Sequence, residues 1–116
     1  MTENPGLDQA APSPDGAALI DELRLSIDSL DRQIIALLAE RTHVVRTLTE
    51  FKRDEETVRS PARVEQVIAK VRGLAAEHGM PADIAEATYR TLIDELTRMQ
   101  LVRLEERRAA ERGDGP

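Results

Sequence analysis

The sequence predicts an all-α protein in which each chain forms three helices, one of them very long, and two chains intertwine as a homodimeric six-helix bundle. Apolar residues recur with helical spacing between the two tails, and no segment alternates with a period of two. Two proline-containing interruptions divide this pattern into three stretches. The first stretch is about three times the usual helix length, so the two shorter helices of its own chain should not cover it alone.

The first helix should begin after Asp15 as N-cap and run to about Lys52, which corresponds to roughly 54 Å at 1.5 Å per residue. Its heptad stripe consists of Ile20, Leu23, Ile27, Leu30, Ile34, Leu37, Arg41, Val44, Leu48 and Phe51. Arg41 is the one charged member. An inward guanidinium costs several kcal/mol unless an anion or hydrogen bonds meet it, so Arg41 indicates either a bound anion, an internal ion pair or a stem that snorkels to the surface.

Two further helices follow. Residues 53–59 are polar and aperiodic, and Ser60 and Pro61 supply a cap and a first-turn proline for the second helix. The stripe of this helix is Val64, Val67, Ile68, Val71, Leu74 and Ala75, and it should end at His78 and Gly79. Pro81 precedes the third helix, which carries Ile84, Ala85, Thr88, Leu92, Leu96 and Met99, with Gln100 and Arg103 beside them, and should fade after Leu104. Short connections predict antiparallel neighbours.

These elements define one domain. Residues 1–16 contain prolines and glycines and almost no large apolar side chain, which predicts a disordered tail. Residues 17–108 form the predicted helical domain. Residues 109–116 should be a frayed C-terminal tail, preceded by charged residues that extend the last helix into solvent.

Composition excludes several functions. The net charge is −6, with 22 acidic against 16 basic residues, and the aromatic residues are Phe51 and Tyr89, so nucleic-acid binding is disfavoured. Cysteine is absent, and His43 and His78 have no ligand spacing, so no metal site is expected. No run approaches the roughly 18 apolar residues of a membrane span and no signal peptide is evident. We therefore expect a cytoplasmic protein without a membrane partner.

Three cations on the first helix predict a shared anion site. Arg24, Arg41 and Lys52 are separated by 17 and 11 residues, or roughly 25 and 16 Å of helical rise. Eleven positions return to within about 20° of the same face, whereas 17 positions lie about 100° away. Arg41 and Lys52 can therefore converge on one small ligand. If Arg24 contributes to that site, an antiparallel partner subunit should supply it.

The motif LR-x2-ID-x-LD-x2-I-x-ALLAER at residues 23–41, followed by FK at 51–52, PARV at 61–64 and MQ at 99–100, resembles the all-helical chorismate mutase family. The resemblance covers residues 17–104. It implies an intertwined homodimer that binds a small dicarboxylate and rearranges chorismate to prephenate, without a cofactor, in aromatic amino acid biosynthesis by the shikimate pathway. Such a reaction is pericyclic, so catalysis depends on a compact substrate conformer and on stabilised charge at the ether oxygen.

The resemblance also implies roles for individual residues. Arg41 and Arg24 of the partner subunit would bind the substrate carboxylates. Lys52 would contact a carboxylate and the ether oxygen, Gln100 would donate its amide to the same oxygen, and Arg63 would complete the positive wall. Each of these side chains has a simpler interpretation as a solvated or ion-paired helix residue. Arg32, Arg46, Arg53 and Arg59 are interpreted as surface or loop charges, although Arg59 sits where a mobile loop at residues 53–60 could fold over an anionic ligand.

Ser60 and Val64 depart from the pattern of family members dedicated to chorismate, which carry an aspartate and a glutamate near these positions. Valine accepts no hydrogen bond, so recognition of the substrate 4-hydroxyl must be weaker or use another group. The same Arg-Val pair is similar to isochorismate pyruvate lyases and aminodeoxychorismate mutases of specialised metabolism, so isochorismate remains an alternative substrate. An inactive mutase, an accessory subunit activated by a partner enzyme and a non-catalytic helical dimerisation module also remain open.

Overall fold

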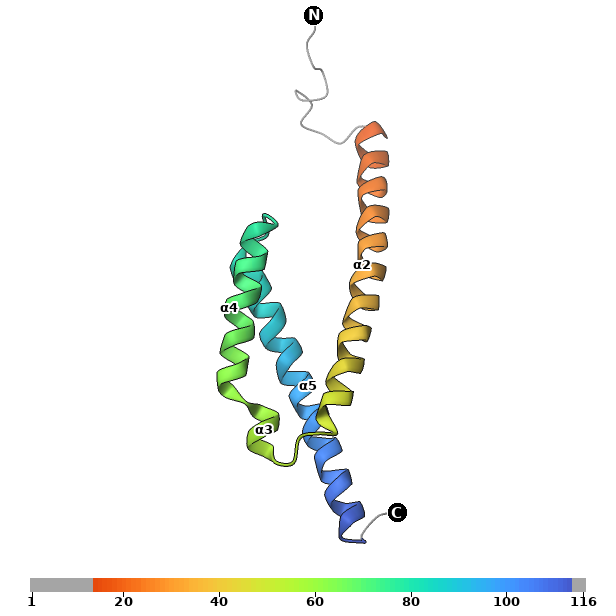
Figure 1. Cartoon of the computed structure of the whole chain (residues 1–116). Helices are drawn as coiled ribbons and strands as arrows, with labels where there is room; N and C mark the ends of the chain where they lie inside the picture. The colour runs from red at the N-terminus through yellow and green to blue at the C-terminus, as the bar shows by residue number, and fades with distance from the viewer. Residues whose placement is uncertain (1–13, 114–116) are drawn as a thin grey trace, which may run out of the picture. The chain divides into compact units, whose positions relative to one another are not determined.

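The computed structural model describes residues 14–113, and every regular element within them is helical (Figure 1). The elements are α2 (Pro14–Thr49), α3 (Glu55–Arg59), α4 (Pro61–Glu77) and α5 (Ala82–Glu111). The prediction of an all-α chain with three substantial helices is confirmed, and the short α3 is an addition to it. The intertwined homodimer stays a prediction. The chain divides into two compact units, Met1–Glu40 and Arg41–Pro116, and each is described by itself.

Helix α2 is 36 residues long, as its apolar stripe predicts, but its ends differ by a few residues from those expected. It begins at Pro14, so the end of the predicted N-terminal tail forms its first turn, while residues 1–13 lie outside the described part. Proline suits the first helical position because its missing N–H would have no partner there, and Asp15 in the first turn complements the helix dipole. The helix ends at Thr49 rather than Lys52.

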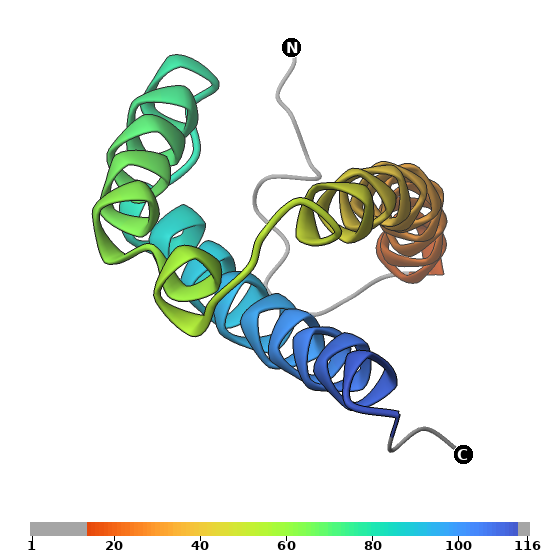
Figure 2. The ribbon, with the colours of Figure 1, turned by 60° about the horizontal axis from the view of Figure 1, so that its bottom comes forward.

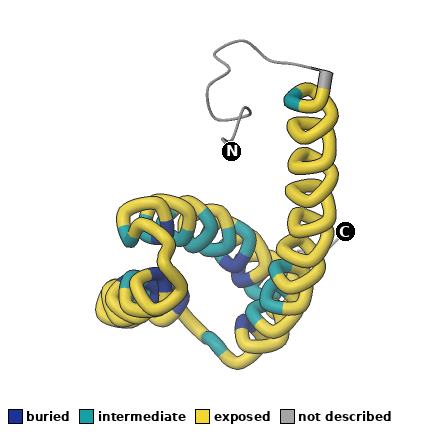
Figure 3. The backbone as a smooth tube through the Cα atoms, turned by 90° about the horizontal axis from the view of Figure 1, so that it is seen from above, coloured by how far each residue is buried: buried dark blue, intermediate teal, exposed yellow. Residues whose placement is uncertain are grey.

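Within its own unit, residues 14–40, the apolar stripe of α2 is exposed. Ile27 is 56 % exposed, Leu30 is 55 % exposed and Leu37 is 64 % exposed. Figure 3 shows exposed backbone along most of this helix, with buried residues concentrated in α4 and α5. Apolar side chains in this number at helical spacing are typical of a face that another helix covers.

Helix α3 corrects the expectation of an aperiodic connection at residues 53–59. Asp54 caps it, because the Asp54 carboxylate accepts hydrogen bonds from the Thr57 backbone N–H and from the Thr57 hydroxyl, both at 2.7 Å. These bonds hold the pKa of Asp54 below its ordinary value. Val58 is 4 % exposed, so burial of one apolar side chain against the neighbouring helices fixes this single turn.

Helices α4 and α5 lie side by side and antiparallel, joined by a short turn at Gly79 (Figures 1 and 2). The helix-ending signals at this turn are confirmed: His78 is the C-cap of α4, and Gly79 has a φ of 75° that favours glycine. The buried apolar residues of the pair are Ile68, Val71, Ala75, Ala85 and Leu104. Three members of the second predicted stripe and Ala85 of the third are therefore in the core, whereas Leu74 and Ile84 are about half exposed.

Ion pairs on the outer side of this pair connect α4 to α5. Arg72 contacts Asp83 at 2.8 Å and Glu86 at 2.9 Å, while Arg90 contacts Glu86 at 2.7 Å and Glu65 at 3.0 Å. Arg90 and then Arg72 hold the pKa of Glu86 below its ordinary value. These groups are solvent-accessible, so they fix the register of the two helices more than they add to stability.

Helix α5 continues to Glu111, so the expected fading after Leu104 was wrong. The reason is that the charged C-terminal segment has partners: Arg103 pairs with Glu50 through two hydrogen bonds of 2.8 Å, and Arg107 binds main-chain carbonyls after the end of α2. Among the described helices, none is long and apolar enough to cross a membrane.

Candidate anion-binding site

A cavity of about 150 Å³ lies within the unit formed by residues 41–116, where the last turns of α2 meet α3, α4 and α5. Its polar and charged lining residues are Arg41, Lys52, Arg59, Ser60, Arg63, Thr97 and Gln100. Apolar side chains complete the wall, namely Val45, Leu48, Val58, Val64, Val67, Ile93 and Leu96. The cavity thus combines an apolar surface with several cations, which suits a small anion that also has a hydrocarbon part.

Arg41 reaches this cavity from α2 and is only partly exposed. Its guanidinium carbon lies 5.4 Å from the centre of the Tyr89 ring on α5. Attraction between the cation and the face of the aromatic ring stabilises a guanidinium at this position. The N–H groups lie in the plane of the guanidinium and can still donate to a ligand. Arg41, the charged residue of the apolar stripe, therefore lies against an aromatic ring and lines the cavity.

Lys52 and Gln100 contact each other at one side of the cavity. Lys52 Nζ donates to Gln100 Oε1 at 3.0 Å, and Thr49 Oγ1 lies 3.1 Å from the same oxygen and 2.7 Å from the carbonyl oxygen of Val45. Because an ammonium group only donates, the Gln100 atom facing Lys52 must be the oxygen. The amide nitrogen Nε2 of Gln100 is consequently left as a donor on the other branch of the side chain.

Burial governs the electrostatics of this contact. Gln100 is 6 % exposed and Thr49 is 2 % exposed, which makes them the buried polar side chains of the described chain. Burial also lowers the pKa of Lys52 from its ordinary value, because desolvation disfavours the ammonium. No carboxylate is among the described residues that line the cavity. An entering anion would therefore meet several cations, of which Arg59 is already paired with Glu55 at 2.9 Å.

Ser60 is the residue between α3 and α4, and it has a φ of 35° and a ψ of 68°. This left-handed conformation costs a non-glycine residue roughly 1 to 2 kcal/mol. The Ser60 side chain makes no capping hydrogen bond to α4, contrary to its expected role as an N-cap. Ser60 is also the C-cap of α3, where its backbone N–H donates to the Glu56 carbonyl oxygen at 2.8 Å, and the left-handed conformation is typical of such a helix end.

The cavity brings together six of the seven predicted site residues: Arg41, Lys52, Ser60, Arg63, Val64 and Gln100. Arg63 is exposed and donates to Gln66 Oε1 at 2.9 Å. Arg24 lies in the other unit, on the N-terminal part of α2, and its contribution stays a prediction. The chemical roles of all seven residues also stay predictions.

Sequence reasoning did not identify Thr49, Tyr89, Thr97 or Arg107, and it interpreted Arg59 as a loop charge. Arg59 lines the cavity, while its Nε donates to Glu55 at 2.9 Å. The sequence feature that could have drawn attention to Tyr89 is that it is the single tyrosine of this chain. Among residues 14–113, no group of three or more His, Cys, Asp or Glu side chains is placed to hold a metal ion.

Helices around a partly apolar cavity that several cations line define a helical protein suited to small organic anions. Comparison with known proteins narrows this class. The family model for chorismate mutase type II matches residues 23–101, which include the long helix from Leu23 and every cavity-lining residue. The chain belongs to the chorismate mutase type II family.

Three curated relatives have different names. The chain is 29 % identical to a chorismate mutase of Methanocaldococcus jannaschii over 86 residues, covering 73 % of this chain and 87 % of the relative. It is 28 % identical to a 4-amino-4-deoxychorismate mutase of Streptomyces pristinaespiralis, covering 83 % and 78 %. It is 26 % identical to an isochorismate pyruvate lyase of Pseudomonas aeruginosa, covering 70 % and 80 %. The chain is about equally similar to relatives with three different activities. These similarities support the family and do not distinguish between the three reactions.

Proposed function

We propose that this protein is a chorismate mutase that rearranges chorismate to prephenate without a cofactor. In this reaction one C–O bond of the ether breaks while one C–C bond forms within the same molecule. No nucleophile and no proton transfer are needed. The protein must hold the side chain of the substrate over its ring and stabilise the negative charge that grows on the ether oxygen.

The observation that carries this proposal is the orientation of the Gln100 amide. Its oxygen is occupied by Lys52 Nζ at 3.0 Å, so its Nε2 group is available to a ligand oxygen. The Lys52 ammonium retains further protons for the same purpose. A cation and an amide donor fixed against each other in a largely buried place form the arrangement that stabilises a developing oxyanion.

The remaining cations suit the two substrate carboxylates. Arg41 and Arg63 line the same cavity as Lys52. A guanidinium binds a carboxylate through two parallel N–H groups, which fixes orientation as well as position. We assign one carboxylate to Arg41 and the other to Arg24 of the partner subunit, with Arg63 completing the positive wall.

The exposed apolar stripe of α2 is the reason that this assignment includes a second subunit. This stripe is about half exposed in the single chain, and two such helices running antiparallel would cover each other. An antiparallel partner would also bring its N-terminal half, which carries Arg24, beside the C-terminal half that carries Arg41. The proposal therefore includes an obligate homodimer with two shared sites.

The charges of the cavity favour a hydroxylated ring over an aminated one. The charged residues that line it are Arg41, Lys52, Arg59 and Arg63, all cationic. An amino group at ring carbon 4 is largely protonated near neutral pH, and these cations would repel it. A neutral hydroxyl meets no such repulsion, and Ser60 and Thr97 offer hydroxyl partners in the cavity wall. Chorismate is therefore preferred to its 4-amino analogue.

Val64 favours a second candidate, an isochorismate pyruvate lyase. Val64 lines the cavity where a dedicated mutase carries a carboxylate, so no acceptor at that place selects for a 4-hydroxyl. Arg41, Lys52 and Gln100 would suit both reactions, because both break the same kind of ether bond. A purely structural helical module explains these residues less well, since a dimerisation surface gains nothing from Arg41 and Lys52 in one cavity.

Product analysis tests the proposal. Purified protein is incubated separately with chorismate and with isochorismate, and prephenate, salicylate and pyruvate are measured. The proposal expects prephenate from chorismate at a rate that exceeds pyruvate release from isochorismate. Faster pyruvate release would instead identify the lyase, and no product from either substrate would remove both assignments.

Replacing Val64 with glutamate separates the two reactions further. In a mutase, the Val64→Glu carboxylate would accept from the 4-hydroxyl and improve kcat/KM for chorismate by about tenfold, as expected for about 1.5 kcal/mol from a charged hydrogen bond. In a lyase, the same carboxylate would obstruct a ring whose hydroxyl is on another carbon, and pyruvate release would fall. Val64→Gln is the matched control, because it adds similar volume without charge.

A further inference from the structure

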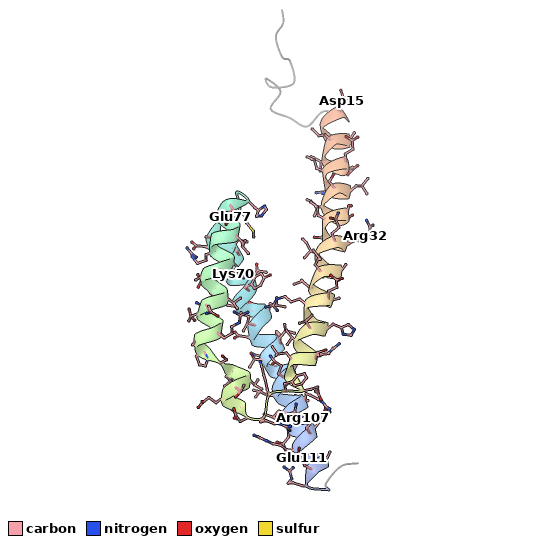
Figure 4. The ribbon with its side chains drawn as sticks, viewed as in Figure 1. Asp15, Arg32, Lys70, Glu77, Arg107 and Glu111 are labelled. Atoms are coloured by element: carbon pink, nitrogen blue, oxygen red, sulfur yellow. The ribbon has the colours of Figure 1, made fainter. Side chains whose placement is uncertain are left out.

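The guanidinium of Arg107 binds two main-chain carbonyl groups that lie on either side of the turn after α2. Arg107 Nη1 donates to the Thr49 carbonyl oxygen at 2.6 Å, and Nη2 donates to the Lys52 carbonyl oxygen. The Arg107 side chain is 13 % exposed, which makes it far more buried than the other paired arginines of α5. Figure 4 labels this residue on the C-terminal part of α5.

The Thr49 carbonyl accepts twice at the end of α2. The Lys52 backbone N–H donates to it at 3.1 Å and closes the turn, and Arg107 adds a second donor from α5. Cations commonly bind such carbonyls, although they usually come from the same helix. Here the cation comes from α5, 58 residues away from Thr49 in sequence. A single planar group thereby attaches the turn of residues 49–52 to α5.

The segment held in this way carries two of the side chains that meet Gln100. Thr49 Oγ1 and Lys52 Nζ lie 3.1 and 3.0 Å from Gln100 Oε1. Gln100 and Arg107 both belong to α5, separated by about two helical turns. Arg107 therefore fixes the main chain of residues 49–52 to the same helix whose Gln100 receives their side chains.

Neighbouring contacts stabilise the same turn from its outer side and are weaker. Arg103 pairs with Glu50 on an exposed surface, where its side chain is 47 % exposed. Arg108 Nη2 lies 3.4 Å from the carbonyl oxygen of Arg53, which is a long hydrogen bond. Neither group contacts Thr49 or Lys52. The position of Lys52 thus depends on Arg107 more than on the other two arginines.

We propose that Arg107 is a positioning residue that holds the turn after α2 so that Lys52 and Thr49 remain on the Gln100 amide oxygen. It touches no ligand and acts through the main chain. Its catalytic consequence rests on the proposed function, whereas its effect on Lys52 is a property of the protein alone. Without the guanidinium, water would satisfy the two carbonyls and the Lys52 side chain would be released toward solvent.

Two variants separate geometry from charge. Arg107→Ala removes the guanidinium, while Arg107→Lys retains the positive charge and replaces the rigid planar fork by a point charge on a shorter, flexible stem. Arg98→Ala is the matched control, because Arg98 lies on the same helix and pairs on the exposed surface with Glu95 three residues earlier. Circular dichroism and sedimentation establish that each variant retains the helical content and assembly of the unmodified protein.

The first measurement is the Lys52 pKa in protein labelled with ¹³C-lysine. Lys52 and Lys70 are the lysines of the sequence, and Lys70 is exposed on α4, so it is an internal reference. Arg41, Arg59 and Arg63 line the same cavity as Lys52, and no variant alters them. Arg107 binds the Lys52 carbonyl, and its positive charge is lost in Arg107→Ala but kept in Arg107→Lys. Release of Lys52 from its partly buried place should raise its pKa toward the ordinary value of a lysine in both Arg107 variants.

The side-chain NH₂ signals of Gln100 should shift in the same two variants, because the amide loses its fixed donors. Arg98→Ala should change neither Lys52 nor Gln100. A folded Arg107→Lys protein in which the Lys52 pKa and the Gln100 signals are unchanged would overturn the proposal. The extra lysine of that variant gives a separate signal, which is absent from Arg107→Ala.

Turnover provides the second measurement. We expect kcat to fall at least tenfold in Arg107→Lys with KM changed less than threefold, and the alkaline limit of kcat/KM to move upward with the Lys52 pKa. A proportional loss of kcat and of folded protein, with an unmoved pH limit, would contradict a positioning role. If the spectroscopic changes occur in a protein that converts neither chorismate nor isochorismate, the positioning role stands and the proposed function fails.

Discussion

Removing the Gln100 amide should slow the chemical step while leaving substrate binding nearly intact. In Gln100→Leu the side chain keeps a similar volume and loses both its Nε2 donor and the oxygen that accepts from Lys52 Nζ at 3.0 Å. The ether oxygen of the substrate is more negative in the transition state than in the ground state. A donor to this atom therefore contributes more to kcat than to KM.

The size of the effect follows from the burial of this donor. Gln100 is 6 % exposed, so water does not readily replace its amide. Loss of one preorganised donor of this kind costs about 3 to 4 kcal/mol in the barrier, which corresponds to a kcat that is roughly 100- to 1,000-fold lower. KM should change by less than about fivefold, because the arginines that hold the carboxylates are untouched.

Steady-state kinetics with chorismate provide the assay, and Gln66→Leu is the matched control. Gln66 is an exposed glutamine of α4 that also accepts from a cation, Arg63, at 2.9 Å. This control should retain kcat within about threefold, because an exposed amide is replaced by water. A Gln100→Leu protein that is folded, with a raised KM and an unchanged kcat, would refute the assigned role.

Three further predictions concern Lys52, the subunit interface and Ser60. Burial lowers the Lys52 pKa, so kcat/KM should have its full value below that pKa and fall as pH rises through it, at a pH below the ordinary lysine range. In Lys52→Arg this decline should disappear, whatever activity remains. Arg24→Ala and Arg41→Ala chains, each inactive alone, should regain activity when mixed, since one site of each mixed dimer carries both arginines; mixed dimers that form and stay inactive would show that Arg24 does not act across the interface. Ser60→Gly should raise the free energy of unfolding by about 0.5 to 1 kcal/mol, because glycine adopts a φ of 35° without strain, and urea titration should show Ser60→Ala to be no more stable than the unmodified protein.

Apolar periodicity predicted most of the fold because each long helix buries or presents one face. The stripe from Ile20 to Phe51 predicted a helix of the observed length, and Pro61 and Gly79 marked the limits of α4. Helix α3 was missed because a single turn has no period to detect. It depends on the Asp54 cap and on burial of Val58 by residues distant in sequence.

The candidate site was predictable where its residues share one helix or one motif. The 11-residue separation of Arg41 and Lys52 predicted that the two side chains could converge, and both line the cavity, although α2 ends at Thr49 and Lys52 lies in the segment after it. The contacts of Gln100 with Thr49 and of Arg107 with Thr49 join residues 51 and 58 positions apart. No local pattern encodes such separations, so the residues that fix the Gln100 amide emerged from the structure alone.

The central claim is that the cation-lined cavity between α2, α3, α4 and α5 binds the dicarboxylate, and a crystal structure of the protein with prephenate tests it most directly. The account predicts a dimer with one ligand in each cavity. One carboxylate should contact Arg41 and the other Arg24 of the partner subunit, with Lys52 and Gln100 within hydrogen-bond distance of a ligand oxygen. Prephenate bound outside this cavity would contradict the account. So would a structure in which Arg24 and Arg41 contact ligands in two different sites.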